Sequence, residues 1–419
     1  MVIPIARAKL EPNGPQSTWA TWTSAPHRTL FLPGALQLVC AVAFIAWEVG
    51  GRSLGFWATP AWVLPPAWAH AYLMLFALFP WFMFGFAMTA MPKWTDVPIR
   101  RVEWLACGLP MFAGVILIHV GLATSRELVL VGATLHLAGW LAGAIAVARI
   151  AFNGASRDVQ AISISVLLFV GVILGALFVV GMAREDSAAI AMASAGALWL
   201  FLLPIFLVVS HRMIPFFSSR VLAGYVVYRP ALSLSLLGAA CVAHFVLDAA
   251  ALDGWTWVAD APMAAWVGWL AWKWGISQSF RARLLAMLHV SLSVLAAALA
   301  FSTLASLAAA AGHAGLFGRG PLHLLGIGYF AAMTIAMVSR VSLGHSGRAL
   351  EADEGTWYGF LALIGVGVLR ALADFAPLAG APRAALLGLA AMAWIAIVAS
   401  WAARFVPLYL RPRADGRPG

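Results

Sequence analysis

Residues 321–350 read PLHLLGIGYFAAMTIAMVSRVSLGHSGRAL, and this stretch decides the class of fold. His323 stands at the start of an apolar run that is about as long as an α-helix needs to be to cross a bilayer. The run ends in a turn rich in Gly, Arg and His. Ionisable groups at the edge of a membrane span are costly to desolvate, so they usually serve function. The stretch therefore predicts a membrane helix with functional residues at both ends.

The composition of the whole chain also indicates an integral membrane protein. Of the 419 residues, 63% are hydrophobic and 10% are charged, whereas soluble domains are about half apolar and about a quarter charged. The net charge of +10 comes from Lys and Arg residues in short runs between apolar segments. This pattern is typical of membrane topology and argues against a nucleic-acid partner. The three cysteines lie inside apolar segments without a CxxC spacing, which predicts no disulfide framework.

Twelve apolar segments are long enough to span a bilayer. We therefore expect an all-α, polytopic bundle of about twelve transmembrane helices. The membrane domain covers residues 29–406, between an N-terminal segment, 1–28, and a basic C-terminal tail, 407–419. Pro80 and Pro204 lie inside predicted spans and should kink them. The expected spans are 29–50, 68–91, 104–123, 128–148, 160–182, 188–210, 231–250, 257–274, 284–310, 322–340, 357–376 and 384–406.

The distribution of Lys and Arg predicts the orientation of the bundle. If the N-terminus is cytoplasmic, 20 of the 26 Lys and Arg residues fall on the cytoplasmic side and 6 on the other. Cytoplasmic loops carry an excess of these residues, and a missing span would place every later loop on the wrong side. Both termini are therefore expected in the cytoplasm.

The ten histidines are the main candidates for chemistry. Neutral imidazole is the commonest protein ligand of metals and a usual axial ligand of haem iron. No HxH, HxxxH or CxxC pair is present, so a metal would be held by side chains from different helices. The histidines expected near the outer face are His70, His119, His244 and His323. Those expected near the cytoplasmic face are His211, His289 and His345.

Two alternatives to metal binding stay open for these residues. His119, His136 and His244 can each serve only to hydrogen-bond a neighbouring helix, and His27 and His313 are expected to be solvated loop residues. Methionines on the second and tenth spans offer thioether ligands for Cu(I), or ordinary core packing.

Acidic residues are nearly absent from the predicted spans. Asp248, Asp260 and Asp374 lie close to span ends, which argues against a proton-driven transporter. The chain also contains no Walker A loop, nucleophile elbow or dinucleotide fingerprint.

Residues 337–350, MVSRVSLGHSGRAL, closely resemble the signature of the NnrS family, M-[MS]-x-R-V-[ST]-L-G-H-[ST]-G-R-x-L. Three further stretches resemble family motifs: the second-span motif, the turn after span 6 and the approach to the signature. They are HAYLMLFALFPWFMFGFAMTAMPKW (70–94), HRMIPFF (211–217) and PLHLLGIGYFAAMTIAM (321–337). One departure concerns the start of span 2, where many members carry H-A-H-E-M. This chain has Tyr72 in place of the second histidine, which implies one ligand fewer or a different role for Tyr72.

The resemblance implies a bacterial inner-membrane, multi-pass protein with haem and copper as cofactors. It further implies a role in the response to nitric oxide and nitrosative stress, in bacteria that carry out or meet denitrification. By resemblance, Arg340 and Arg348 would contact haem propionates or another anion. The implied haem or copper ligands are His70, His289, His323 and His345, with His211 as a weaker candidate.

Three functions stay open at this point. The first is a haem/copper protein that binds or turns over nitric oxide, or relieves its damage to cellular iron. The second is a transporter of a small solute or metal without bound haem, and the third is a structural subunit of a respiratory complex. The depth of the histidines allows two centres. The outer centre would contain His70 and His323, and the inner centre would contain His289 and His345.

Overall fold

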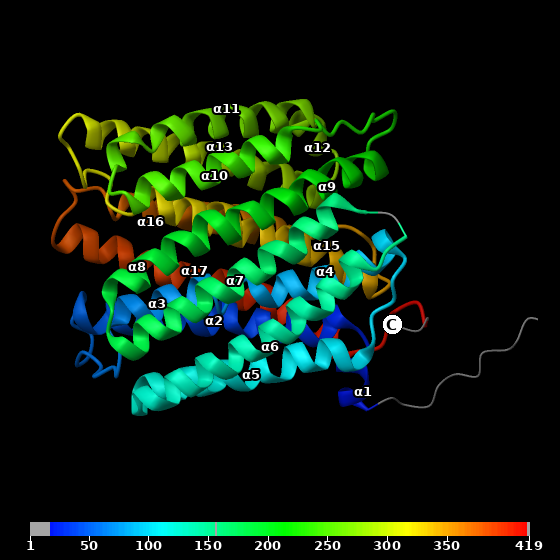
Figure 1. The fold of residues 1–419 in the computed structure, drawn as a ribbon, viewed down its shortest axis with the longest axis horizontal. Helices are drawn as coiled ribbons and strands as arrows, with labels where there is room; N and C mark the ends of the chain where they lie inside the picture. The colour runs from blue at the N-terminus through cyan, green and yellow to red at the C-terminus, as the bar shows by residue number, and fades with distance from the viewer. Residues whose placement is uncertain (1–16, 156, 417–419) are drawn as a thin grey trace, which may run out of the picture.

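The structure is a computed structural model that describes residues 17–155 and 157–416. Every regular element within these ranges is a helix, and the long helices run along one axis of the molecule (Figure 1). Among the described residues, ten helices are long and apolar enough to cross a membrane. The predicted polytopic helical bundle is therefore confirmed. The predicted end segments, 1–28 and 407–419, lie partly outside the described residues.

The first half of the chain forms six passes, which a short helix, α1 (Thr18–Trp22), precedes. The passes are α2 (Pro26–Arg52), α3 with α4 (Pro66–Leu75, Pro80–Thr95), α5 (Arg101–Thr124), α6 (Arg126–Phe152), α7 (Val159–Arg184), and α8 with η1 and α9 (Ser187–Gly196, Ala197–Leu202, Leu203–Val221).

The second half forms six more passes, and short helices η2 (Asp253–Trp255) and α12 (Ile276–Ser279) flank the second of these. The passes are α10 (Ser233–Ala249), α11 (Trp257–Lys273), α13 (Arg283–Ala310), α14 with η3 and α15 (Gly320–His323, Leu324–Ala331, Ala332–His345), α16 (Glu354–Leu372), and α17 (Ala381–Leu410). Twelve helical segments follow the twelve predicted ones in order, but only ten of those in the described residues are long and apolar enough to cross a membrane, against the twelve expected. Helices α10 and α11 have 17 residues each and are the shortest passes.

Three passes are interrupted, two of them beside a proline. Pro80 opens α4 after a break that follows α3, and Pro204 lies in the first turn of α9, directly after η1. The segments η1 and η3 are π-helical. A π-helical turn inside a helix is rare and is found mostly at functional sites. The region that the interrupted segments enclose is therefore a candidate functional site.

The two ends of the described chain meet at one end of the bundle, which we call the terminal end (Figure 1). Arg28 is buried near the start of α2, and its Nη1 donates to the Arg411 carbonyl at 2.7 Å and to the Tyr409 carbonyl at 3.3 Å. This arrangement agrees with termini on the same side of a membrane. We call the opposite end, where α2 ends and α3 begins, the far end.

Helices α5 and α6 pack closely along a line of glycines. A Cβ atom added to Gly114 would lie 2.5 Å from the Gly132 carbonyl oxygen, and one added to Gly139 would lie 2.6 Å from the Cys107 carbonyl oxygen. Small residues let membrane helices approach closely enough for dispersion contacts to hold them together. These glycines fix the pair at the edge of the bundle, below the central helices in Figure 1.

Candidate functional site

A cavity of about 1020 Å³ opens among the helices at the far end. Residues of α3, α8, α10, α13, α14, α16 and α17 line it, as do residues of both π-helical segments. Ligand and cofactor sites are typically concave, and cavities of several hundred Å³ hold small molecules. We call this space the far-end cavity.

His323 on α14 lies in the wall of the far-end cavity with one ring nitrogen already engaged. Its Nδ1 lies 2.9 Å from the Arg319 carbonyl oxygen and 3.0 Å from Asp374 Oδ2. Both neighbours are acceptors, so Nδ1 carries the proton and Nε2 keeps its lone pair. A histidine whose Nδ1–H is held by a carboxylate or carbonyl is the usual arrangement of a metal ligand.

The side chain of Asp374 is ionised and lies beside two arginines. Arg370 Nη1 lies 2.8 Å from Oδ2, and Arg383 Nη2 lies 3.4 Å from Oδ1. Burial alone would raise the pKa of the Asp374 carboxyl, yet its contacts with His323 and Arg370 lower the pKa to about 2. At neutral pH the Asp374 carboxylate is therefore always ionised and accepts the hydrogen bond from His323 Nδ1.

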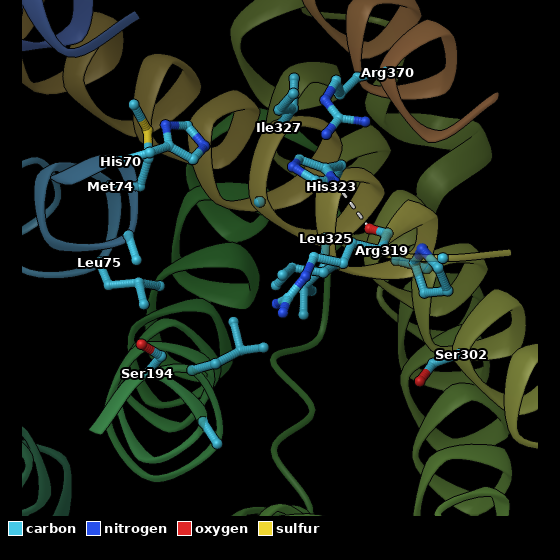
Figure 2. A pocket seen from close by; sticks show the side chains of 18 of the residues that line it. His70, Met74, Leu75, Ser194, Ser302, Arg319, His323, Leu325, Ile327 and Arg370 are labelled. Atoms are coloured by element: carbon cyan, nitrogen blue, oxygen red, sulfur yellow. Dashed lines mark hydrogen bonds between the residues drawn. The ribbon is translucent and has the colours of Figure 1, made fainter. Parts of the chain in front are cut away.

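His70 faces the same cavity from α3. Figure 2 shows the rings of His70 and His323 on opposing walls, with Met74 beside His70. The Nδ1 atom of His70 is buried and has no hydrogen-bond partner among the described residues. Met74 lies one helical turn after His70, so both side chains belong to one face of α3. The cavity thus collects two imidazoles and one thioether, a donor set that suits Cu(I).

Two arginines complete the polar lining near His323. Arg319 precedes His323 by one turn and Arg370 belongs to α16, and both reach the cavity (Figure 2). Guanidinium groups pair with carboxylates in a planar, two-pronged geometry. These two arginines were not predicted as site residues. The sequence signals for them are four-residue spacings, from Arg319 to His323 and from Arg370 to Asp374.

Tyr72, which follows His70 by two residues, contacts α6. Its hydroxyl lies 3.5 Å from His136 Nδ1 and 3.4 Å from the Ala133 carbonyl oxygen, both on α6. Its ring packs against Phe76 and Phe178. Tyr72 is therefore engaged with α6 and does not line the far-end cavity.

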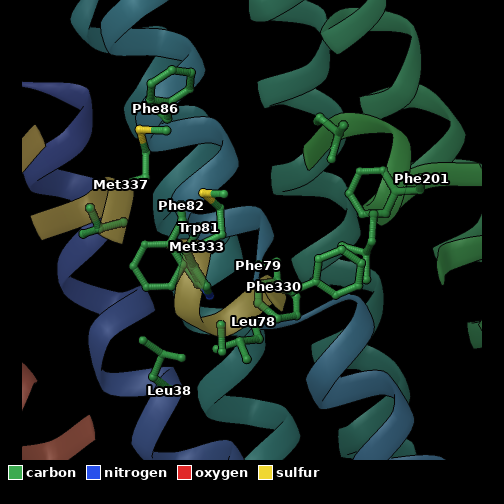
Figure 3. Close-up of a cluster of buried hydrophobic side chains, with 14 of the residues drawn as sticks. Leu38, Leu78, Phe79, Trp81, Phe82, Phe86, Phe201, Phe330, Met333 and Met337 are labelled. Atoms are coloured by element: carbon green, nitrogen blue, oxygen red, sulfur yellow. The ribbon is translucent and has the colours of Figure 1, made fainter. Parts of the chain in front are cut away.

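The methionines of α15 occupy the core of the bundle. Met333 and Met337 are buried and lie among Phe82, Phe86 and Phe330 (Figure 3). Together with aromatic residues they border an apolar gap of about 60 Å³. A flexible thioether fills such irregular spaces well. Core packing accounts for these two methionines, whereas Met74 reaches the far-end cavity.

The predicted inner ligands have separate neighbours. His289 on α13 is fully buried, and its Nε2 lies 3.0 Å from the Ser218 hydroxyl on α9. His345, at the end of α15, lies against His27 of α2, with ring centroids 4.6 Å apart. His211 is buried on α9 and meets Trp274 edge-on at 5.9 Å. The structure thus places all three toward the terminal end but gives each a different partner.

The expectation that His27 is a solvated loop residue is wrong. Pro26 opens α2, so His27 belongs to its first turn, and the side chain is buried. The end of α17 packs over this turn through the Arg28 contacts. His313, by contrast, is exposed in the loop after α13, as expected.

Arg340 and Arg348 lie at the terminal end and differ in their partners. The guanidinium carbon of Arg340 lies 4.1 Å above the Phe217 ring, and the side chain is buried. Arg348 Nη1 is buried and has no hydrogen-bond partner among the described residues. A buried, unpaired guanidinium N–H is costly, so Arg348 is the better placed of the two to receive an anion.

His119, His136 and His244 all contact neighbouring helices, as the alternative to metal binding predicted. His119 Nε2 lies 3.0 Å from Gln37 Oε1, and His136 lies against Tyr72. His244 Nδ1 lies 2.6 Å from Asp260 Oδ1. Within the described part of the chain, no group of three or more His, Cys, Asp or Glu side chains is gathered closely enough to form a metal site by itself.

A comparison with known protein families identifies the family of this chain. The family model described as NnrS protein matches residues 21–413, nearly the whole chain. The chain belongs to the NnrS family. No curated protein matches the sequence. In this NnrS-family membrane protein, the signature turn around His345 lies at the terminal end, whereas the His70 and His323 motifs lie at the opposite end and share one cavity.

Proposed function

We propose that this protein binds haem and copper and interacts with nitric oxide in the bacterial inner membrane, as part of the nitric oxide response. The observation that carries the proposal is the far-end cavity, in which His70 and His323 face each other from different helices. Asp374 holds His323 in the tautomer that a metal requires. Membership of the NnrS family supports the link to nitric oxide.

The residues of the far-end cavity fit both cofactors. Its volume of about 1020 Å³ is at the upper end of the range for small-molecule and cofactor sites. His70 and His323 would be the metal ligands, and Met74 would add a soft ligand suited to Cu(I). Arg319 and Arg370 would pair with the propionates of a haem. When bound, such a metal supplies a coordination position for nitric oxide.

The terminal end offers a second position for an anionic cofactor group. Arg348 contributes the buried, unpaired Nη1 atom, and His345 and His27 lie side by side. His289, His211 and Arg340 remain predicted contacts in this half of the bundle. The charge of Arg348 would be neutralised by a propionate, which removes the cost of leaving it buried alone.

Binding of nitric oxide at the far-end cavity would serve the cell in one of two ways. The protein would turn nitric oxide over, or it would hold it away from cellular iron. In either case the residues of this chain orient the metal, exclude bulk water and neutralise the propionates.

A transporter is the second candidate, and two observations favour it. Three passes are interrupted, and both π-helical segments border the far-end cavity. Discontinuous helices around a central site are typical of transporters. A transporter of this kind is expected to purify without colour, which separates the two candidates.

The deciding experiment is an optical spectrum of the detergent-purified protein, oxidised and reduced, with metal analysis of the same sample. We expect a Soret band that shifts when nitric oxide is added, and copper in the same preparation. His323→Ala should lose haem or copper, whereas the matched control His313→Ala, in an exposed loop, should keep both. A folded, colourless and metal-free protein would favour the transporter.

A further inference from the structure

A second polar cluster borders the far-end cavity, and none of its residues is among the metal ligands or anion contacts proposed above. His244 of α10 lies with Nδ1 2.6 Å from Asp260 Oδ1 of α11. Ser302 of α13 donates its hydroxyl to Asp260 Oδ2 at 2.7 Å. Three helices therefore meet at one carboxylate, and both of its oxygens are engaged.

The cluster is buried on one side and open to the cavity on the other. Asp260 is 0% exposed, whereas His244 and Ser302 both line the cavity. The ring of Trp199, in the π-helical segment η1, stacks on His244 with centroids 3.4 Å apart and planes 23° apart. Asp260 accepts the Nδ1 proton, so the neutral imidazole keeps its lone pair on Nε2.

Other charges near His244 come from few elements. Asp248 lies one turn further along α10, Asp253 belongs to η2, and Arg319 belongs to the loop before α14; all three border the cavity. The described residues of α8 and η1 that line it are uncharged. Asp260 on α11 is therefore the one carboxylate in hydrogen-bond contact with His244 in the described structure.

Two helices can be linked by a hydrogen bond between neutral side chains, without a buried carboxylate. The same bundle joins α2 to α5 through the neutral pair of Gln37 and His119, at 3.0 Å. A carboxylate buried among membrane helices is costly, and such groups usually mark proton or ion pathways. The pair of His244 and Asp260 therefore differs from that neutral link in placing a carboxylate, 0% exposed, beside an imidazole.

We propose that His244 and Asp260 form a buried proton-binding site that is loaded from the far-end cavity. A hydronium ion in the cavity transfers a proton to His244 Nε2, where a new N–H bond forms, and leaves as water. The Nδ1–H stays bonded to Asp260, whose negative charge balances the imidazolium. Ser302 donates a hydrogen bond to the second carboxylate oxygen and so fixes the orientation of Asp260 toward His244.

The geometry favours a proton over a metal ion as the ligand of this site. His244 offers one free lone pair, on Nε2, because Nδ1 is engaged by Asp260. Trp199 covers one face of the ring. An imidazolium against an indole face is also stabilised by a cation–π contact.

The role of such a site is to balance charge in a cavity of low dielectric constant. An anion that enters the cavity adds negative charge, which interior electrostatics penalise strongly. A proton taken up at His244 offsets that charge within the same cavity. The proposal concerns residues of this chain alone and does not depend on haem or copper.

The test is a pH titration of the full-length protein in detergent without added cofactor, with ¹³C-labelled histidine observed by NMR. The His244 resonance is identified by its loss in His244→Gln. We expect the resonance to report proton binding in the wild type, and in Asp260→Asn the proton should bind at least ten-fold more weakly, because the imidazolium has lost its negative partner. The matched control is His119→Gln, which removes a membrane-embedded histidine paired with an amide and should leave the His244 titration unchanged.

Two further measurements keep the test decisive if Asp260→Asn does not fold. Ser302→Ala removes one hydrogen bond to the carboxylate and should shift the His244 titration in the same direction by a smaller amount. Trp199 fluorescence should change with pH in the wild type and not in His244→Gln. A His244 resonance that does not move with pH, or that titrates identically when Asp260 or Ser302 is replaced, overturns the proposal.

Discussion

The imidazole rings of His27 and His345 lie 4.6 Å apart, and this contact joins the first turn of α2 to the family signature at the end of α15. Arg413 donates to the His345 carbonyl at 3.1 Å, so the C-terminal segment closes over the same place. The signature turn is therefore part of a packed joint between the beginning, the middle and the end of the chain.

This joint predicts an energetic coupling between the two histidines. Contacts between stacked or tilted rings contribute about 0.5–1.5 kcal/mol, and residues in contact show non-additive effects of similar size. His27→Ala and His345→Ala should each lower the free energy of unfolding, and the double variant should lose about 0.5–1.5 kcal/mol less than their sum. Denaturant unfolding in detergent measures this, with His313→Ala as the exposed control. Fully additive losses would show that the rings do not interact.

Asp374 should control metal affinity without touching the metal. It holds His323 through Nδ1, and the loss of such an outer partner typically costs about 10–100-fold in metal affinity. Asp374→Asn should therefore weaken copper binding by about this factor, as measured by competition with a chelator. The control is Asp186→Asn at the start of α8, where asparagine caps a helix as well as aspartate does. Equal affinities in the two variants would exclude His323 as a ligand.

Asp374 also predicts an acid-sensitive step in stability. Its pKa is about 2 in the folded protein, against about 3.9 in an unfolded chain. A lowered folded pKa gives stability that is present above about pH 4 and is lost as the pH falls toward 2. The wild type should lose thermal stability over this window, and Asp374→Asn should lose less. Parallel curves for the two proteins would contradict the assignment.

Arg348 should help to retain an anionic cofactor at the terminal end. Its unpaired Nη1 is buried, so Arg348→Ala should lower the haem content after detergent purification and leave the fold intact. Arg220→Ala is the matched control, because that arginine is exposed in the neighbouring α9. The ratio of Soret to protein absorbance reports the result. If the two variants keep equal haem, Arg348 has only a topological role.

The glycine line between α5 and α6 makes a prediction about stability alone. A Cβ at Gly114 would lie 2.5 Å from the Gly132 carbonyl oxygen and 2.6 Å from the His136 amide nitrogen. Backbone atoms cannot move aside cheaply, so Gly114→Ala should cost about 1–3 kcal/mol. Gly238→Ala on α10 meets nothing within 4 Å and should be neutral or slightly stabilising. Thermal unfolding of both variants checks the difference.

The order and approximate bounds of the helical segments could be predicted from the sequence, because hydrophobic length is a local property; the count of twelve spans exceeds the ten helices of the described residues that are long and apolar enough to cross a membrane. The pairing of His70 with His323 was also predicted, since both histidines stand at far-end starts of spans. The contacts of Asp374 and Arg319 with His323 were not predicted, because they depend on how the helices pack. Local sequence carries no information about which of these elements touch.

The burial of two residues near helix ends was not predicted. His27 was expected in solvent, but it is buried and its ring lies against His345. Asp260 lies near the start of its span, where the sequence gives no sign of its burial. The structure buries it completely, because α10 and α13 close around α11 at that level. In both cases a distant part of the chain changed the solvation of a residue near a helix end.

The contact between Arg28 and the end of α17 also constrains how the protein is made. The guanidinium near the start of the first span finds its carbonyl acceptors at Leu408, Tyr409 and Arg411, which the ribosome delivers about 380 residues later. Until then, the nascent first span holds a positive charge without these acceptors. A chain that stops before its last pass therefore never forms these contacts, and the guanidinium near the start of its first span stays without them.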